Sequence, residues 1–169
     1  IFQTANLREL NNMTAKVLIS EDNPMIQQVF KAFFNDCETK ICDTGADTIE
    51  TALKEKFQLL IQDYYLADDI LGTDVALKIL DKYPISVLLI SASEDIDEQK
   101  ISKIENHPNI QFFKRIRKGE EFDILKVFKN RLINNSKTFN TNCDIHGPVI
   151  KDNTFNIYCG QKEGEKNDD

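Results

Sequence analysis

The chain has 169 residues, of which 41% are hydrophobic and 29% are charged, and its formal net charge is −7. This length suits one domain with a full core plus appendages, and it is too short for two ordinary domains. No apolar run approaches the roughly 20 residues that cross a bilayer. The acidic charge argues against broad electrostatic binding of nucleic acid, which needs clustered lysine and arginine. We therefore expect neither a membrane span nor a nucleic-acid partner.

The four cysteines are Cys37, Cys42, Cys143 and Cys159. Because no signal-peptide pattern precedes them, they are expected to be reduced thiols, which predicts a cytoplasmic protein. Cys143 and His146 have a Cys-x2-His spacing, but a structural zinc site usually needs two such pairs. Ordinary tail residues are therefore favoured over a zinc site.

The expected organisation is a leader at 1–13, one domain at 14–134 and a C-terminal tail at 135–169. The leader lacks a starting Met and a clear period. Within the tail, residues 149–158 are expected to form a short hairpin, and the last residues are expected to be disordered.

Apolar runs and helical periods alternate from residue 16 onward. Residues 16–20 (KVLIS) form the first expected strand, and Asn23 with Pro24 then suits the cap and first position of a helix. The apolar face of that helix, which should end near Asn35, comprises Met25, Ile26, Val29, Phe30 and Phe33.

The same unit repeats four more times. Further strands are expected at 40–42, 57–62, 85–91 and 110–114, and helices at 45–56, at 73–82, after a cap at Ser93, and at 119–132. The runs at 57–62 and 85–91 are too continuously apolar to have a solvated face, which is typical of parallel sheets. The alternation predicts a doubly wound α/β domain with a five-stranded parallel sheet.

Polar residues end the expected strands: Glu21 and Asp22, Asp63, Ser91, and Lys114. Because the carboxyl ends of parallel strands meet at one edge of a sheet, these side chains should converge. Neighbouring carboxylates repel, and a hard cation such as Mg²⁺ suits them. Beside a metal, a carboxylate can act as the nucleophile in phosphoryl transfer, with an ammonium and a hydroxyl neutralising the incoming charge.

This set resembles the receiver domain of two-component response regulators, the CheY-like family. The matching segments within residues 15–133 are LISEDNP, LLIQDYY, LLISAS and IQFFKR. The resemblance implies a flavodoxin-like (βα)5 fold with strand order 2-1-3-4-5, here followed by a C-terminal extension.

By this resemblance Asp63 accepts a phosphoryl group from a histidine kinase or a histidine phosphotransfer protein. Asp22 binds Mg²⁺ directly, Glu21 assists through a metal-bound water, and the metal ligands are completed by Asp63 itself and the backbone carbonyl of Tyr65.

The resemblance also implies that Ser91 and Lys114 sense the phosphoryl group. Phosphorylation would then change contacts with a downstream protein target. The domain is expected to signal and not to act as an enzyme, apart from its own Mg²⁺-dependent phosphorylation and dephosphorylation. The resemblance also allows a homodimer through the fourth helix, the fifth strand and the fifth helix.

The sequence departs from the family at several positions. Arg115 follows Lys114 where the family has Pro, and Gln111 stands three residues before Lys114 where the family has a switch aromatic. The loop after Asp63 has Ala67 in place of Pro and is longer than usual, so we expect altered loop shapes.

Two other functions remain open. Altered loops could make the chain a pseudo-receiver, an interaction scaffold that phosphorylation does not regulate. A small Mg²⁺-dependent phosphohydrolase would need a second acid two residues after the nucleophile, where Tyr65 stands. We expect the loop and first-turn acids Asp68, Asp69 and Asp74 to be solvated and His107 to lie on the surface.

Overall fold

The computed structural model describes residues 14–138. The predicted leader, the Cys143–His146 pair and the predicted hairpin at 149–158 lie outside the described residues. No helix in the described part of the chain combines the length and apolar composition of a membrane span.

Strands and helices alternate along this part of the chain. The strands pair in parallel throughout, in the order β2-β1-β3-β4-β5, which confirms the predicted fold class. In chain order the elements are β1 (Lys16–Ser20), α1 (Pro24–Phe33), β2 (Glu38–Cys42), α2 (Gly45–Lys54), β3 (Leu59–Asp63), α3 (Gly72–Leu80), β4 (Ile85–Ser91), α4 (Glu98–Glu105), β5 (Ile110–Arg117) and α5 (Glu121–Thr138).

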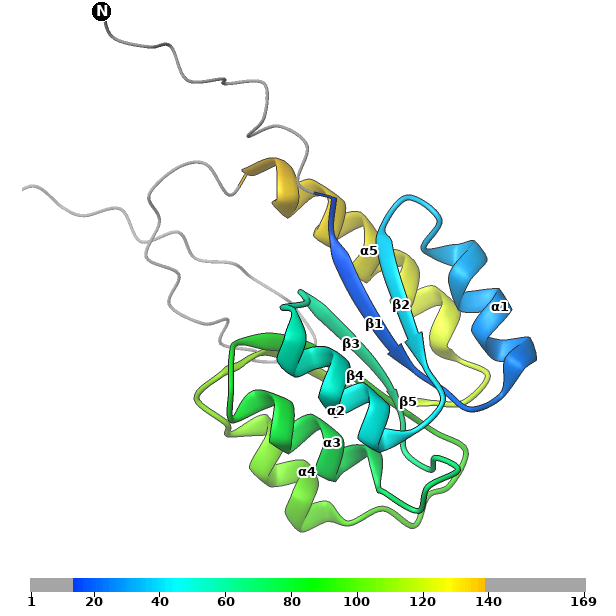
Figure 1. Ribbon diagram of the computed structural model, residues 1–169, viewed down its shortest axis with the longest axis vertical. Coiled ribbons are helices and arrows are strands. Elements are labelled where there is room, and N and C mark those ends of the chain that lie inside the picture. The colour runs from blue at the N-terminus through cyan, green and yellow to red at the C-terminus, as the bar shows by residue number, and fades with distance from the viewer. Residues whose placement is uncertain (1–13, 139–169) are drawn as a thin grey trace, which may run out of the picture.

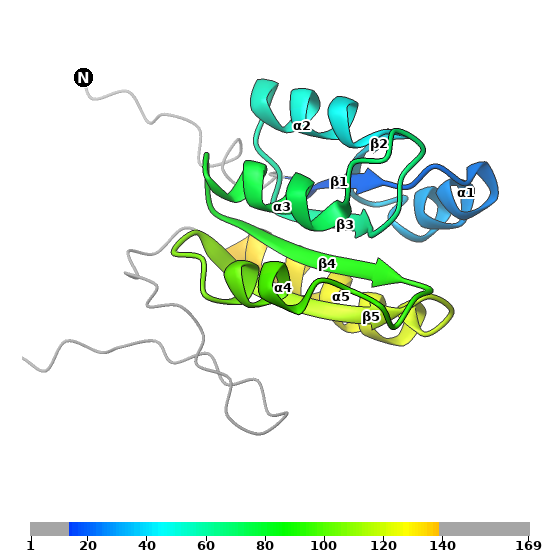
Figure 2. The same ribbon diagram turned by 90° about the horizontal axis from the view of Figure 1, so that it is seen from below.

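The sheet is covered on both faces. Helices α2, α3 and α4 lie on one face, and α1 and α5 lie on the other (Figure 1 and Figure 2). Strands β3 and β4 are buried along their whole length, which explains the apolar runs in their sequences. Because all the strands are parallel, their carboxyl ends meet at one edge of the domain.

The first helix begins as predicted and buries part of its predicted face, because Ile26, Phe30 and Phe33 contact the core. The Asn23 side chain accepts a hydrogen bond from the backbone N–H of Met25, at 3.0 Å. Phe30 and Phe34 are buried, whereas Met25 and Val29 are 80% and 45% exposed. The buried stripe therefore lacks two predicted residues and gains Phe34, which lies four residues after Phe30 and hence on the same face.

The expected start of the fourth helix at Ser93 is wrong. Asp97 is the N-cap of α4, and its side chain accepts hydrogen bonds from the backbone N–H groups of Gln99 and Lys100. Ser93 instead stabilises the preceding turn, where its Oγ accepts a hydrogen bond from the N–H of Asp95 at 3.0 Å.

Two further boundaries differ at the end of the domain. Strand β5 continues to Arg117, beyond the expected end at residue 114, and α5 continues to Thr138, across the predicted domain boundary at residue 134. The extension of β5 changes which lysine follows the strand, and this affects the site.

Candidate functional site

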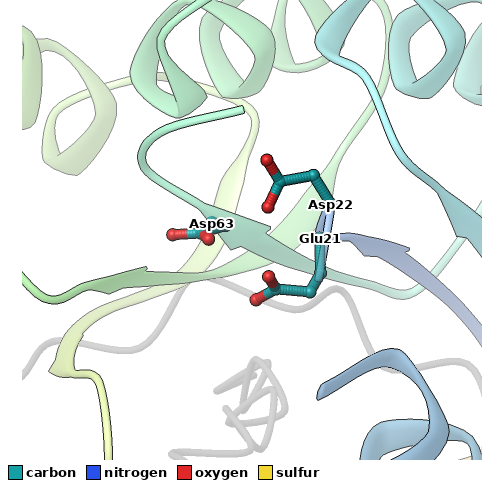
Figure 3. A group of neighbouring side chains, drawn as sticks. All are labelled: Glu21, Asp22 and Asp63. Carbon is teal, nitrogen blue, oxygen red and sulfur yellow. The ribbon is translucent and has the colours of Figure 1, made fainter. Parts of the chain in front are cut away.

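Three carboxylates gather at the carboxyl ends of β1 and β3. Ser20 and Gln62 are register partners in the sheet, so the residues that follow them, Glu21 and Asp63, are neighbours. Carboxylate oxygens of Glu21, Asp22 and Asp63 lie within 4.8 Å of one another. Figure 3 shows the Glu21 and Asp22 side chains extending from the end of β1 on the side of Asp63. The predicted convergence of these acids therefore occurs in the structure.

Lys118 is the cation that meets this acidic group. Its Nζ lies 2.8 Å from Asp63 Oδ2 and 3.3 Å from Glu21 Oε2. Its backbone N–H donates to the carbonyl of Ser91 at 2.8 Å, which ties the residue after β5 to the end of β4. The sequence interpretation did not identify this residue.

Lys114, expected at the end of the strand, lies in the interior of β5. It pairs in register with Leu88, in the middle of β4, and is exposed. The expectation failed because the basic residues after Lys114 look like a loop, whereas β5 is an edge strand that tolerates charged side chains. The buried Ile116 between two arginines is the sequence signal that the strand continues.

The predicted departures around Lys114 change with this reassignment. Gly119 follows Lys118, and its φ of 102° is in the left-handed region that glycine adopts without strain. No peptide bond within residues 14–138 is cis. Arg115 now stands three residues before the lysine, and its Nη1 lies 2.8 Å from Glu98 Oε1 at the start of α4.

Ser91 and Tyr65 flank the acids. Ser91 ends β4 and is buried, and its Oγ donates to the carbonyl of Ser93 and accepts from the N–H of the same residue, both at 3.0 Å. Tyr65 lies two residues after Asp63 with its side chain 52% exposed. Its hydroxyl lies 3.5 Å from the carbonyl of Asp95, so the side chain extends between the loops that follow β3 and β4.

Burial and charge perturb the acidic group. Burial, followed by the negative charge of Asp63, raises the pKa of Glu21, although the Asn23 N–H and Lys118 oppose the shift. For Lys118, burial opposes the charged form, but the hydrogen bond and charge of Asp63, reinforced by Glu21, raise its pKa overall. The site thus holds excess negative charge that one ammonium only partly neutralises.

The donor set fits a hard divalent cation. All three groups offer carboxylate oxygens, the ligands that Mg²⁺ prefers, and Asp22 is exposed and accessible from solvent. A cation there would relieve the repulsion between Glu21 and Asp63. Glu21, Asp22 and Asp63 are therefore the residues that could hold Mg²⁺.

Of the acids that follow Asp63, Asp69 is exposed as expected, whereas Asp68 and Asp74 have partners. Asp68 accepts hydrogen bonds from the N–H groups of Gly45 and Ala46 at 3.1 and 3.0 Å, so it caps the start of α2. Asp74 pairs with Lys100 of α4 at 2.7 Å. Asp68 thereby attaches the loop after β3 to α2, and Asp74, in the first turn of α3, attaches α3 to α4.

His107 is also less exposed than expected. Its side chain is only 14% exposed, and Nε2 lies 3.2 Å from Asp81 Oδ1.

Comparisons with known proteins identify the fold. No family model and no curated protein matches the sequence. Among solved structures, the chain is similar to the signal receiver domain of a protein described as a Luxo repressor from Vibrio parahaemolyticus, with 27% identity, a TM-score of 0.58, and coverage of 75% of this chain and 95% of that chain.

Other solved receiver domains share the fold at lower identity. A CheY-like receiver domain from Methanospirillum hungatei JF-1 has 20% identity, a TM-score of 0.59, and coverage of 74% of this chain and 98% of that chain. The signal receiver domain of an HD domain-containing protein from Pseudomonas fluorescens Pf-5 has 14% identity, a TM-score of 0.60, and coverage of 75% and 92%. The predicted resemblance to CheY-like receiver domains is confirmed.

Proposed function

We propose that this chain is a response regulator receiver that accepts a phosphoryl group on Asp63. The observation that carries the proposal is the arrangement of Asp63 at the end of a buried strand, between two further acids and the ammonium of Lys118. The phosphoryl donor would be a histidine kinase or a histidine phosphotransfer protein.

In the proposed reaction an Asp63 carboxylate oxygen attacks phosphorus, and the bond from phosphorus to the donor histidine nitrogen breaks. Bound Mg²⁺ would neutralise charge on the transferred group. Glu21 and Asp22 would hold the cation together with Asp63 and the carbonyl of Tyr65. Lys118 already lies against Asp63 Oδ2, so its ammonium is placed to neutralise a phosphoryl oxygen, the role that sequence analysis gave to Lys114.

Ser91 is proposed to report the phosphoryl group. Its hydroxyl now bonds to the backbone of Ser93 at 3.0 Å. A donor hydrogen bond from Ser91 to a phosphoryl oxygen would break the bond to the Ser93 carbonyl. That exchange would alter the loop before α4 and so change contacts with a downstream protein.

The alternatives make different demands on the site. A small Mg²⁺-dependent phosphohydrolase with Asp63 as nucleophile would need a carboxylic acid at position 65 to act as general acid. Tyr65 stands there instead, so we propose a signalling domain and not an enzyme. A cytoplasmic location and a homodimer through the face of α4, β5 and α5 stay predictions. The pseudo-receiver remains the second candidate because Asp68 holds the loop after β3 against the start of α2, which would limit its movement.

Beryllofluoride, a phosphoryl mimic, separates the two candidates. With Mg²⁺ it should shift the amide resonances of the loops after β3 and β4 in the wild type and leave an Asp63→Asn variant unchanged. Identical spectra with and without the mimic in the wild type would favour the scaffold. Steady turnover of a generic phosphomonoester would instead revive the phosphohydrolase.

A further inference from the structure

A buried polar cluster lies beneath the acids, on the face of the sheet that α2 and α3 cover. It consists of Ser20, Thr48 and Gln62, all fully buried. Ser20 and Gln62 are the last residues before Glu21 and Asp63, and they pair in register across β1 and β3. Two residues earlier on the same face of the two strands, Leu18 and Leu60 belong to the apolar core. The polar layer is therefore confined to the site.

The Gln62 amide links the two acid-bearing strands. Its Nε2 lies 2.9 Å from Ser20 Oγ and 2.8 Å from the backbone carbonyl oxygen of Asp63. A carbonyl oxygen can only accept, so the nitrogen of the amide must face Asp63. The Gln62 side chain thus bonds both to the backbone of Asp63 and to Ser20, the residue before Glu21.

The chain of hydrogen bonds continues to α2. Thr48 Oγ1 lies 2.8 Å from Ser20 Oγ and 2.7 Å from the carbonyl oxygen of Thr44. Each hydroxyl has a single proton, so the arrangement that uses every donor runs in one direction. Gln62 donates to Ser20, Ser20 donates to Thr48, and Thr48 donates to the carbonyl of Thr44, the N-cap of α2.

The surroundings leave the Asp63 backbone little freedom. A Cβ on Gly72, the first residue of α3, would lie 2.3 Å from the Asp63 carbonyl oxygen and 2.9 Å from Gln62 Cγ. The Gly72 N–H donates to the carbonyl of Tyr64 at 2.8 Å. The start of α3 therefore packs directly on the peptide that the Gln62 amide contacts.

The amide is a poor choice for stability alone. Within residues 14–138, Gln62 Oε1 is buried without a hydrogen-bond partner, and leaving a buried acceptor unsatisfied costs free energy. An apolar side chain of similar length would avoid this cost but would lose both hydrogen bonds of the amide nitrogen. Those two bonds fix the geometry at the ends of β1 and β3.

We propose that Gln62 is a positioning residue that fixes the Asp63 backbone relative to Glu21 through the chain Gln62–Ser20–Thr48. The inference rests on the proposed Mg²⁺-dependent function of Asp63. Outer hydrogen bonds of this kind typically change metal affinity about tenfold or more when removed.

The test compares two glutamines that cross-link the same pair of strands. Gln62→Met removes the amide next to the acids at nearly constant volume. Gln58→Met is the matched control, because Gln58 Oε1 accepts from the N–H of Lys16 at 2.6 Å at the opposite end of the strands. Mg²⁺ affinity is measured by amide NMR titration, and hydrogen exchange of the Gly72 amide is measured without metal.

Gln62→Met should weaken Mg²⁺ binding about tenfold and speed exchange of the Gly72 amide, whereas Gln58→Met should leave both unchanged. Ser20→Ala removes the hydroxyl that accepts from the Gln62 amide but keeps the bond of that amide to the Asp63 carbonyl, so it should weaken Mg²⁺ binding less than Gln62→Met does. Unchanged affinity in Gln62→Met, or an equal loss in Gln62→Met and Gln58→Met, would overturn the proposal.

If Gln62→Met does not fold, Thr48→Val breaks the next link and should still weaken Mg²⁺ binding severalfold; unchanged affinity would contradict the proposal. If the wild type itself does not bind Mg²⁺, the proposed function fails. Positioning by Gln62 is then decided by Gly72 exchange alone: faster exchange supports it and equal exchange overturns it.

Discussion

Replacing Lys118 with Met should expose the electrostatic strain of the site. The variant keeps most of the side-chain stem but removes the ammonium that lies 2.8 Å from Asp63 Oδ2 and 3.3 Å from Glu21 Oε2. Removing one partner of a fully buried pair typically costs about 3–5 kcal/mol. Lys118 is 26% exposed, so we expect the free energy of unfolding to fall by about 2 kcal/mol at pH 7 without Mg²⁺, after allowing for solvent screening.

The loss should depend on pH and on Mg²⁺. The pKa of Glu21 is already raised by burial and by Asp63, so its charged form destabilises the fold, and acidification toward its ordinary pKa removes that penalty. The difference between Lys118→Met and wild type should therefore be smaller at pH 5 than at pH 7. Mg²⁺ should also bind the variant more tightly, because the competing ammonium is gone.

Urea unfolding followed by circular dichroism checks these expectations, with Lys114→Met as the matched control. Lys114 is exposed in the middle of β5, so its replacement should change the free energy of unfolding by less than about 0.5 kcal/mol. Equal losses for the two variants would refute the assignment of Lys118 to the site. A loss below about 0.5 kcal/mol for Lys118→Met would refute the electrostatic reasoning.

The other predictions concern the surrounding loops and one thiol. Asp68→Ala removes both capping bonds to α2 and should lower the free energy of unfolding by about 1 kcal/mol in urea, with Asp68→Asn losing less; no change would mean that the cap is unimportant. Tyr65→Ala should shorten the lifetime of the phosphorylated form, because the Tyr65 side chain bridges toward Asp95 beside the acceptor; a wild-type half-life no longer than the variant's would exclude shielding. Burial, reinforced by Asp36, raises the pKa of Cys37 from 9.0 to about 11. At pH 8 the thiolate fraction of Cys37 should therefore be about 100-fold lower than that of an ordinary cysteine. Peptide mapping should show that iodoacetamide reacts with Cys37 at least tenfold more slowly than it reacts with the thiol of glutathione.

The fold was predictable because most of the strands and helices left a distinct trace in the sequence. The buried strands β3 and β4 consist of apolar runs, and the caps of α1 and the acids at strand ends mark the turns between elements. Element order and the parallel sheet follow from this alternation.

The lysine was misplaced for a physical reason. β5 lies at the edge of the sheet, where charged side chains can remain in solvent. In residues 114–118 (KRIRK) only Ile116 is buried. The segment therefore resembles a loop in the sequence. Gln62 was overlooked because one polar residue in an apolar run gives no sign of its partners. Ser20 and Thr48 lie far from it in sequence, and only the sheet register and the docking of α2 bring them together.

Mass spectrometry of the intact protein tests the central claim most directly. The full chain is incubated with a small phosphoryl donor such as acetyl phosphate, with and without Mg²⁺, alongside the Asp63→Asn variant. The account predicts the mass increase of one phosphoryl group in the wild type, dependent on Mg²⁺ and lost in the variant. An equal increase in both proteins, or none in the wild type with Mg²⁺ present, would contradict phosphoryl acceptance by Asp63.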